Sequence, residues 1–258
     1  MDKLWLNGAL LPAAAARIDP ADRGLLLGDG LFETMAAREG TVPELARHYA
    51  RLAHGAALLR IPLPLSLAAL ECAAGNLLAA NGLSEAALRL TLTRGPAPRG
   101  LLPPEPPAPT LLLTTAPPPS GGTLRLITAS IRRDEHSPLS ALKTLNYLPG
   151  VLARIEAAEQ GADDALLLNT QGFVAETSAA NLFVRRGGAW FTPPVADGAL
   201  PGVRRAKLLE SGRIREARLT AEQLLQAEAI FAGNALLLRP VAAIDGRAIP
   251  QTNPAELS

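Results

Sequence analysis

One lysine, Lys143, stands in a segment of otherwise apolar and small residues, SPLSALKTLNYLPGVLARIEAA. The apolar residues of this segment recur at helical spacing, at Leu145, Leu148, Val151, Leu152 and Ile155. This spacing predicts an amphipathic helix, with Lys143 just before it or within its first turn. Because the helix dipole disfavours a cation there, an ordinary lysine would extend its ammonium into water. The alternative is a desolvated, functional amine that forms a Schiff base.

A carboxylate, Glu176, lies in the strand-rich segment FVAETSAANLF. Side-chain alternation along a strand permits it to point outward into water. The functional alternative is a carboxylate aimed at the ring nitrogen of a pyridoxal phosphate, whose pyridine must stay protonated to act as an electron sink. A Schiff-base lysine, this carboxylate and a phosphate site would together make a complete cofactor site.

Three segments offer groups that bind phosphate. Pro201-Gly202 precedes a helix predicted from about Val203, where free backbone N–H groups and the helix dipole favour an anion. A similar glycine turn, 233–235, follows a predicted strand. Arg51, on a predicted helix, can pair bidentately with a phosphate. Ordinary turns and a solvent-facing arginine are the alternative interpretation of these residues.

The composition narrows the class of protein. The chain has 258 residues, 48% hydrophobic and 19% charged, with a formal net charge of +1. This balance excludes a disordered chain and indicates neither a nucleic-acid nor a membrane partner. The single cysteine, Cys72, excludes an internal disulfide and fits a reducing, cytoplasmic location. The three histidines form no cluster in the sequence, so we expect no histidine-based metal site.

Periodicity and turn residues predict a mixed set of elements. The N-terminal part is expected to form a hairpin turning at Asn7-Gly8, a strand pair turning at Glu39-Gly40, a helix within 43–61 that ends before Pro62, and a second helix over 67–80. The proline-rich segment 96–109 is expected to be a stiff surface loop. Because helices and strands mix without a regular βαβ rhythm, the fold class is α+β in two lobes.

The linker prediction rests on PPPSGG at 117–122, in which proline stiffness is followed by glycine freedom. We therefore expect a small N-terminal α/β domain over 1–115, a linker over 116–122 and a larger C-terminal domain over 123–258. No run of the sequence is long and apolar enough to predict a membrane span.

Seven motifs occur in order along almost the whole chain: DRGLLLGDGLFETM, RHYARL, TRGPAPRG, LKTLNYL, ETSAANLF, LPGVRR and GNALLLRPV. In this order they resemble the class IV aminotransferase family of pyridoxal-phosphate (PLP) enzymes. That family includes branched-chain and D-amino acid aminotransferases and aminodeoxychorismate lyase. The resemblance implies PLP fold type IV, similar to D-amino acid aminotransferase, with the cofactor between the two lobes and the larger C-terminal domain as the PLP-binding domain. It also implies a homodimer.

The resemblance assigns roles to individual residues. Lys143 would carry the cofactor as a Schiff base, Glu176 would contact the pyridine nitrogen and Arg51 would hold the phosphate. Backbone around four further residues would help to bind the phosphate: Val203, Arg204, Asn234 and Ala235. Phe32, Arg99 and Tyr147 would contact the substrate, and Thr34 would act near the leaving group.

Three positions separate the members of the family. D-amino acid aminotransferases carry a tyrosine where this chain has Phe32, and Arg-x-His where it has Arg99-Gly100-Leu101. Branched-chain enzymes have glycine where Thr34 stands. Thr34, the Arg-Gly pair 99–100 and GNALLLRPV are more similar to aminodeoxychorismate lyase, which implies release of pyruvate and formation of p-aminobenzoate for folate biosynthesis. Leu101 departs from this pattern, because the lyases often have an aromatic residue there.

Two other interpretations remain. One is a D-amino acid or (R)-amine transaminase that uses the same lysine. The other is a non-catalytic relative that serves as a binding or structural protein. Retention of Lys143, Glu176 and Arg51 together argues against the second.

Overall fold

A computed structural model describes residues 2–257, which divide into two compact units. Unit 1 comprises the chain up to Pro119 together with Lys143–Asn146, and unit 2 comprises Ser120–Leu142 and the chain from Tyr147 onward. The short segment Lys143–Asn146 thus groups with the N-terminal part, although the sequence placed it in a continuous C-terminal domain. The reason is backbone pairing with a strand of unit 1, described below.

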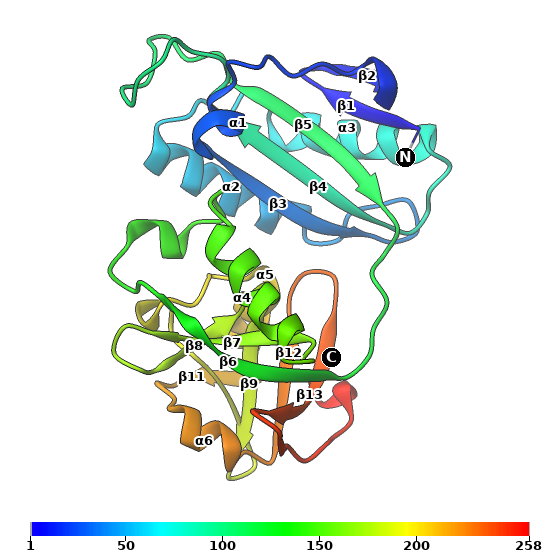
Figure 1. Cartoon of the computed structure of the whole chain (residues 1–258). Coiled ribbons are helices and arrows are strands. Elements are labelled where there is room, and N and C mark those ends of the chain that lie inside the picture. The colour runs from blue at the N-terminus through cyan, green and yellow to red at the C-terminus, as the bar shows by residue number, and fades with distance from the viewer. Residues whose placement is uncertain (1, 258) are drawn as a thin grey trace. The chain divides into compact units, whose positions relative to one another are not determined.

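Unit 1 is a five-stranded antiparallel sheet with the strand order β2-β1-β5-β4-β3. Helices α2 and α3 lie against one side of this sheet (Figure 1). On that side β4 buries Leu88, Leu90 and Leu92, which alternate along the strand as a half-buried strand requires. The elements are β1 (Lys3–Leu6), β2 (Ala9–Pro12), α1 (Arg23–Leu27), β3 (Gly30–Ala37), α2 (Leu45–Leu59), α3 (Leu67–Ala80), β4 (Ala86–Thr93) and β5 (Thr110–Ala116).

The first hairpin and both long helices of unit 1 are confirmed, but the strand pair predicted around Glu39-Gly40 is wrong. The chain does turn there, with a single bridge between Arg38 and Thr41. No strand lies between this turn and α2, and β3 pairs along its whole length with β4 instead. Pro43 explains the difference, because it has no N–H to donate to a ladder and α2 begins two residues later, at Leu45.

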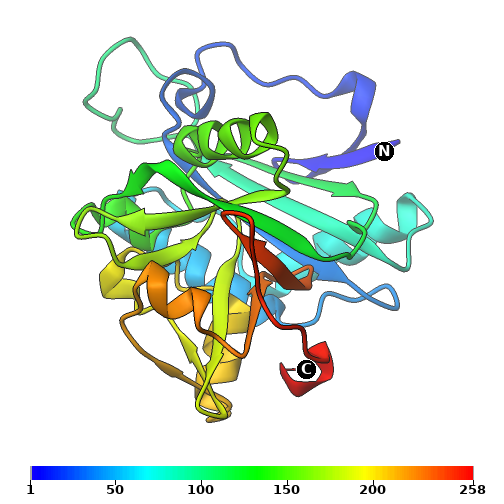
Figure 2. The ribbon, with the colours of Figure 1, turned by 60° about the horizontal axis from the view of Figure 1, so that its bottom comes forward.

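Unit 2 contains a nine-stranded mixed sheet with the order β11-β10-β9-β12-β13-β6-β7-β8, and β14 pairs with β13. Strand β13 lies between β12 and β6, so a late segment of the chain enters the middle of the sheet (Figure 2). The elements are β6 (Leu124–Arg133), α4 (Leu148–Glu159), β7 (Asp164–Asn169), β8 (Val174–Thr177), β9 (Asn181–Arg186), β10 (Ala189–Thr192), α5 (Val203–Glu210), β11 (Ile214–Glu216), α6 (Ala221–Leu225), β12 (Ala229–Gly233), β13 (Leu238–Ile244) and β14 (Arg247–Ala248).

Helix α4 is the amphipathic helix predicted after Lys143, but its apolar stripe faces outward. Leu148 is 73% exposed and Leu152 is 54% exposed. The helix instead packs on the sheet of unit 2 through Ala153 and Ala157, which are fully buried. Small residues allow a close approach of helix and sheet, so the large apolar residues remain on the outer side. Lys143 lies before the helix and outside its first turn.

Two kinds of feature are absent from residues 2–257. None of their helices combines the length and the apolar character that crossing a membrane requires. These residues also contain no group of three or more His, Cys, Asp or Glu side chains placed to hold a metal ion.

Candidate functional site

Lys143 lies in extended backbone along the outer edge of β3. The N–H of Phe32 donates to the carbonyl of Lys143 at 2.9 Å, and Leu31 forms an antiparallel bridge with Thr144. This pairing directs the lysine and Phe32 to the same face, where Lys143 Nζ lies 4.3 Å from the centre of the Phe32 ring. The lysine is thus presented from a sheet edge, half-buried above an aromatic ring.

Gly30 lies against both the segment that carries Lys143 and the neighbouring strand β4. The N–H of Leu145 donates to the carbonyl of Gly30 at 3.0 Å. A Cβ at position 30 would lie 2.8 Å from Leu145 Cδ1 and 2.4 Å from the carbonyl oxygen of Leu92. Because a real Cβ does not approach a backbone oxygen this closely, position 30 requires glycine, and the absence of a side chain there also leaves room for Leu145.

Thr34 shares the face of the sheet that carries Phe32. The two residues alternate along β3, and Thr34 stands opposite Arg89 of β4. The Arg89 guanidinium lies 3.8 Å from the centre of the Phe32 ring. Unit 1 therefore brings Lys143, Phe32 and Thr34 to one face, with Arg89 as a neighbour that sequence reasoning missed.

Arg51 is held by a buried carboxylate, Glu33. Arg51 Nε donates to Glu33 Oε1 at 2.8 Å and Nη2 donates to Oε2 at 2.6 Å. His48 Nδ1 lies 2.7 Å from the same Oε2. Successive side chains of β3 point to opposite faces of the sheet, so Glu33 lies on the face covered by α2, and its side chain is 1% exposed. Sequence reasoning missed Glu33 and His48, although helical spacing places His48 and Arg51 on the same side of α2.

The partners of Glu33 determine its ionisation. Burial raises the pKa of its carboxyl, but hydrogen bonds and electrostatic attraction to Arg51 and His48 outweigh burial and hold that pKa below its usual range. Glu33 is therefore a charged, fully engaged group in the core of unit 1.

Replacing this carboxylate, Glu33→Gln, is expected to lower the free energy of unfolding by about 3 kcal/mol at neutral pH, because it leaves the half-buried Arg51 without its counter-charge. A carboxyl with a depressed pKa stabilises the fold above its unfolded pKa of about 4.3 and loses this effect as the pH falls through the folded pKa. Urea denaturation at pH 7 and at pH 3–4 should therefore show a difference from the wild type that shrinks in acid. Glu71→Gln, on the exposed side of α3, is the control, and an equal effect of both variants would contradict the role of Glu33.

Glu176 lies on β8 in unit 2 and does not point into water. The residue is 9% exposed, and its Oε1 is 3.1 Å from Arg133 Nη2. Its Oε2 accepts a hydrogen bond from the N–H of Leu200 at 3.0 Å. Arg133 is itself oriented by the carbonyls of Gly198 and Ser140, to which it donates. Arg133 was not identified from the sequence, because it is distant from Glu176 along the chain.

Unit 2 brings together the two glycine turns proposed to hold a phosphate. Helix α5 begins at Val203, and Gly202 before it supplies no side-chain cap to the N–H groups of the first turn. Arg204 Nε donates to the carbonyl of Asn234 at 2.8 Å, next to Ala235 in the turn after β12. A Cβ on Gly233 would lie 3.2 Å from Arg204 Cδ. An uncapped helix start beside a glycine turn provides the N–H donors that a phosphate requires.

The two remaining substrate candidates lie in different units. Tyr147 of unit 2 precedes α4 and lines a surface hollow of about 490 Å³ together with Gly150, Arg154 and Ser178. Arg99 of unit 1 is exposed on the proline-rich loop between β4 and β5. Among the described contacts of unit 1, none links Arg99 to Lys143, Phe32 or Thr34.

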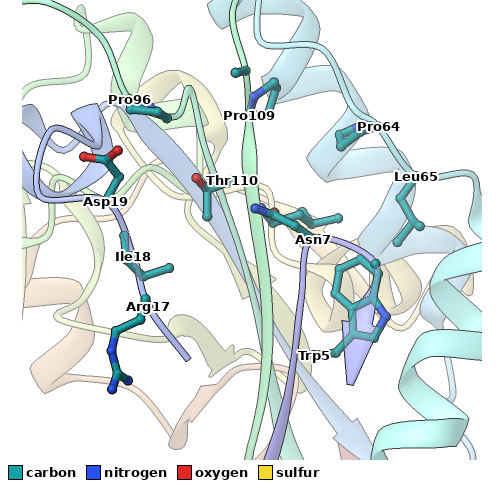
Figure 3. Close-up of a pocket in the computed structure, with 13 residues that line it drawn as sticks. Trp5, Asn7, Arg17, Ile18, Asp19, Pro64, Leu65, Pro96, Pro109 and Thr110 are labelled. Atoms are coloured by element: carbon teal, nitrogen blue, oxygen red, sulfur yellow. The ribbon is translucent and has the colours of Figure 1, made fainter. Parts of the chain in front are cut away.

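A second pocket, of about 580 Å³, lies within unit 1 and is lined by none of the site residues predicted from the sequence. Figure 3 shows Trp5, Pro64 and Leu65 on one side of it and Arg17 and Asp19 on the other. The Arg17 guanidinium already donates to two nearby backbone carbonyls. We assign this pocket no part in the chemistry proposed below.

The chain is similar to known proteins along most of its length. The family model described as Amino-transferase class IV matches residues 30–244. A putative branched-chain-amino-acid aminotransferase of Methanocaldococcus jannaschii is 36% identical, over 99% of this chain and 92% of that protein. A D-alanine aminotransferase of Bacillus licheniformis is 31% identical, over 99% of this chain and 93% of that protein.

Solved structures show the same similarity. The 4-amino-4-deoxychorismate lyase of Pseudomonas aeruginosa has a TM-score of 0.85 and 33% identity, covering 97% of this chain and 94% of that chain. The branched-chain amino acid aminotransferase of Escherichia coli has a TM-score of 0.91 and 26% identity, covering 99% of this chain and 91% of that chain. Another branched-chain amino acid aminotransferase, with a TM-score of 0.91 and 27% identity, was solved with pyridoxamine 5'-phosphate. The α+β fold of the class IV PLP enzymes, expected from the sequence, is confirmed.

Proposed function

The chain belongs to the class IV amino-transferase family of PLP enzymes, and we propose that it is a 4-amino-4-deoxychorismate lyase. In this proposal it uses pyridoxal 5'-phosphate, releases pyruvate and forms p-aminobenzoate, as in folate biosynthesis. Lys143, Glu176 and Arg51 are the residues proposed to hold the cofactor, with the turns at Val203-Arg204 and Asn234-Ala235. The hydrogen bonds of Arg51 and Glu176 support these roles, since both side chains are held in defined orientations.

The cofactor and each of these residues have separate proposed roles in the reaction. PLP, when bound, supplies the electron sink for negative charge that develops on the substrate carbon. Lys143 Nζ would hold the cofactor covalently until the amine of the substrate replaces it, and the freed lysine amine would then take the proton from the amine-bearing carbon of the substrate. Glu176 keeps the proton on the pyridine nitrogen, because Arg133 and the N–H of Leu200 stabilise its carboxylate. Arg51 and the N–H groups of the first turn of α5 hold the phosphate.

The main support for the lyase assignment is the Phe32 ring, which lies beside Lys143. A D-amino acid aminotransferase has a tyrosine where Phe32 stands, but the ring next to Lys143 Nζ has no hydroxyl. The second group of such a carboxylate site, a histidine, is replaced by Leu101, which is apolar and 83% exposed. Two polar groups that would bind a D-amino acid carboxylate are therefore missing. Thr34, half-buried on the same face, is proposed to act near the leaving group.

A transaminase is the second candidate, in particular one that acts on D-amino acids or (R)-amines. The identities of 36% and 31% to proteins named as aminotransferases support it. It would use Lys143, Glu176 and Arg51 in the same way. The two reactions differ in the fate of the amino group, which leaves with the aromatic product of the lyase but stays on the cofactor after the first half-reaction of a transaminase.

Incubation of the holoenzyme with 4-amino-4-deoxychorismate alone is expected to give repeated turnovers and equal amounts of pyruvate and p-aminobenzoate. No amino acceptor is needed, because the nitrogen leaves with the product. D-Alanine and L-leucine, tested separately, should convert the bound cofactor into its pyridoxamine form only slowly. The measurements are product quantitation and the cofactor spectrum. Rapid pyridoxamine formation from either amino acid, without p-aminobenzoate from the chorismate, would favour the transaminase.

We also propose that the chain acts as a homodimer in the cytoplasm on this small-molecule substrate. Apolar side chains that are exposed in the single chain support an additional protein contact. They include Leu25, Leu26 and Leu27 of α1 and the outer stripe of α4.

A further inference from the structure

The loop that carries Arg99 is attached to unit 1 by one side chain. Loop positions 98–107 lie in the proline-rich connection between β4 and β5 and form no regular element. Arg23 Nη1 donates to the carbonyl of Gly100 at 2.8 Å, and Nη2 donates to the carbonyl of Leu101 at 2.9 Å. Within the described residues 2–257, these two are the hydrogen bonds that reach positions 98–107. Arg23 therefore determines where the residues next to Arg99 lie.

Arg23 is rigidly placed for this contact. The residue is 5% exposed, and its Nε donates to Asp29 Oδ2 at 2.7 Å. Its backbone N–H donates to the carbonyl of Gly95 at 3.0 Å. Burial raises the pKa of the Asp29 carboxyl, but hydrogen bonds and charges from Arg94 and Arg23 outweigh burial and keep that pKa below its usual range. The anchor of Arg23 is thus a charged carboxylate.

The geometry requires a guanidinium. One carboxylate oxygen and two consecutive backbone carbonyls accept from three nitrogens of the same planar group. A lysine ammonium carries the same charge but is more compact. It cannot reach the two carbonyls and Asp29 at once, as the planar guanidinium of arginine does. The arrangement therefore depends on shape as well as on charge.

We propose that Arg23 is a positioning residue that sets the loop so that Arg99, directly before Gly100, binds a carboxylate of the substrate. This inference rests on the proposed function, because 4-amino-4-deoxychorismate is a dicarboxylate. An exposed arginine on a mobile loop would lose conformational entropy on binding an anion, and a loop already held at the two following carbonyls loses less. Arg23 itself does not contact the substrate in this proposal.

Arg94 provides a matched comparison within the same cluster. Its Nε donates to the same Asp29 oxygen at 2.8 Å, and its guanidinium also donates to two consecutive carbonyls, those of Leu59 at 2.8 Å and Arg60 at 3.0 Å. Both arginine side chains are 6% exposed. They differ in what they hold, since Arg94 reaches the end of α2 and Arg23 reaches the Arg99 loop.

Arg23→Lys and Arg94→Lys should be compared in the purified holoenzyme. Limited trypsin digestion, with mass analysis of the fragments, reports cleavage after Arg99. We expect Arg23→Lys to speed this cleavage about 10-fold or more, because the loop opens more often. Arg94→Lys should leave the cleavage near the wild-type rate. Equal acceleration in both variants would show general loosening of unit 1 and would overturn the proposal.

Steady-state kinetics with 4-amino-4-deoxychorismate tests the link to the substrate. Arg23→Lys and Arg99→Gln should both raise KM about 10-fold or more, the effect of losing one well-placed charge-assisted hydrogen bond, with a smaller change in kcat. Arg94→Lys should keep the KM of the wild type. Faster cleavage of Arg23→Lys with an unchanged KM would overturn the positioning role. Absence of turnover in the wild type would instead contradict the proposed function, and the digestion result would still show whether Arg23 holds the loop.

Discussion

Lys143→Ala is expected to lower turnover of 4-amino-4-deoxychorismate by about 10³-fold or more, because one change removes both the covalent attachment of the cofactor and the proton carrier. The fold should persist. The contacts that place this segment on β3 come from backbone groups, such as the carbonyl of Lys143 that accepts from Phe32, and alanine retains them. Turnover rate, cofactor absorbance and urea denaturation are the measurements.

Lys3→Ala is the control for this variant, since Lys3 is an exposed lysine at the start of β1. It should keep full activity. Borohydride treatment before digestion should attach the cofactor to the peptide that contains position 143 in the wild type and in Lys3→Ala, but not in Lys143→Ala. Near-normal turnover in Lys143→Ala, or attachment to another lysine, would show that the assignment of Lys143 is wrong.

Arg51→Ala and Glu176→Gln are expected to fail in different ways. Arg51→Ala removes a charge-assisted contact and should weaken PLP binding about 10- to 100-fold. Glu176→Gln should bind PLP almost normally but turn over about 100-fold or more slowly, since a neutral amide cannot keep the pyridine nitrogen protonated. Titration of the apoproteins with PLP and single-turnover kinetics measure the two effects.

Pyridoxal, which lacks the phosphate, separates a local effect of Arg51→Ala from destabilisation of unit 1. Loss of Arg51 also leaves Glu33 without its main partner, so the variant is expected to be less stable. If Arg51 binds the phosphate, the preference for PLP over pyridoxal should fall while pyridoxal affinity stays the same. Equal loss of PLP affinity in Arg51→Ala and Glu176→Gln would contradict the separate roles.

The sequence by itself determined the local elements and the identity of the candidate residues. Helix α3 occupies Leu67–Ala80 as its apolar spacing predicted, and Asn7-Gly8 forms the first hairpin turn. Periodicity succeeds here because it reports which backbone conformation buries one face of a short segment. The order of seven motifs was sufficient to identify the family and to select Lys143, Glu176 and Arg51.

Only the tertiary structure decided which distant groups meet. The pairing of Lys143 with Phe32, the Glu33 carboxylate that holds Arg51 and the Arg133 that holds Glu176 all join positions that no local pattern connects. The packing of helix α4 was likewise not predictable from the sequence. Its apolar residues predicted a helix, but the side that packs on the sheet is the opposite one, which carries small residues. Strand register and helix packing depend on close fit between segments distant in sequence, as between Gly30 and Leu145, and this fit exists only once the chain has folded.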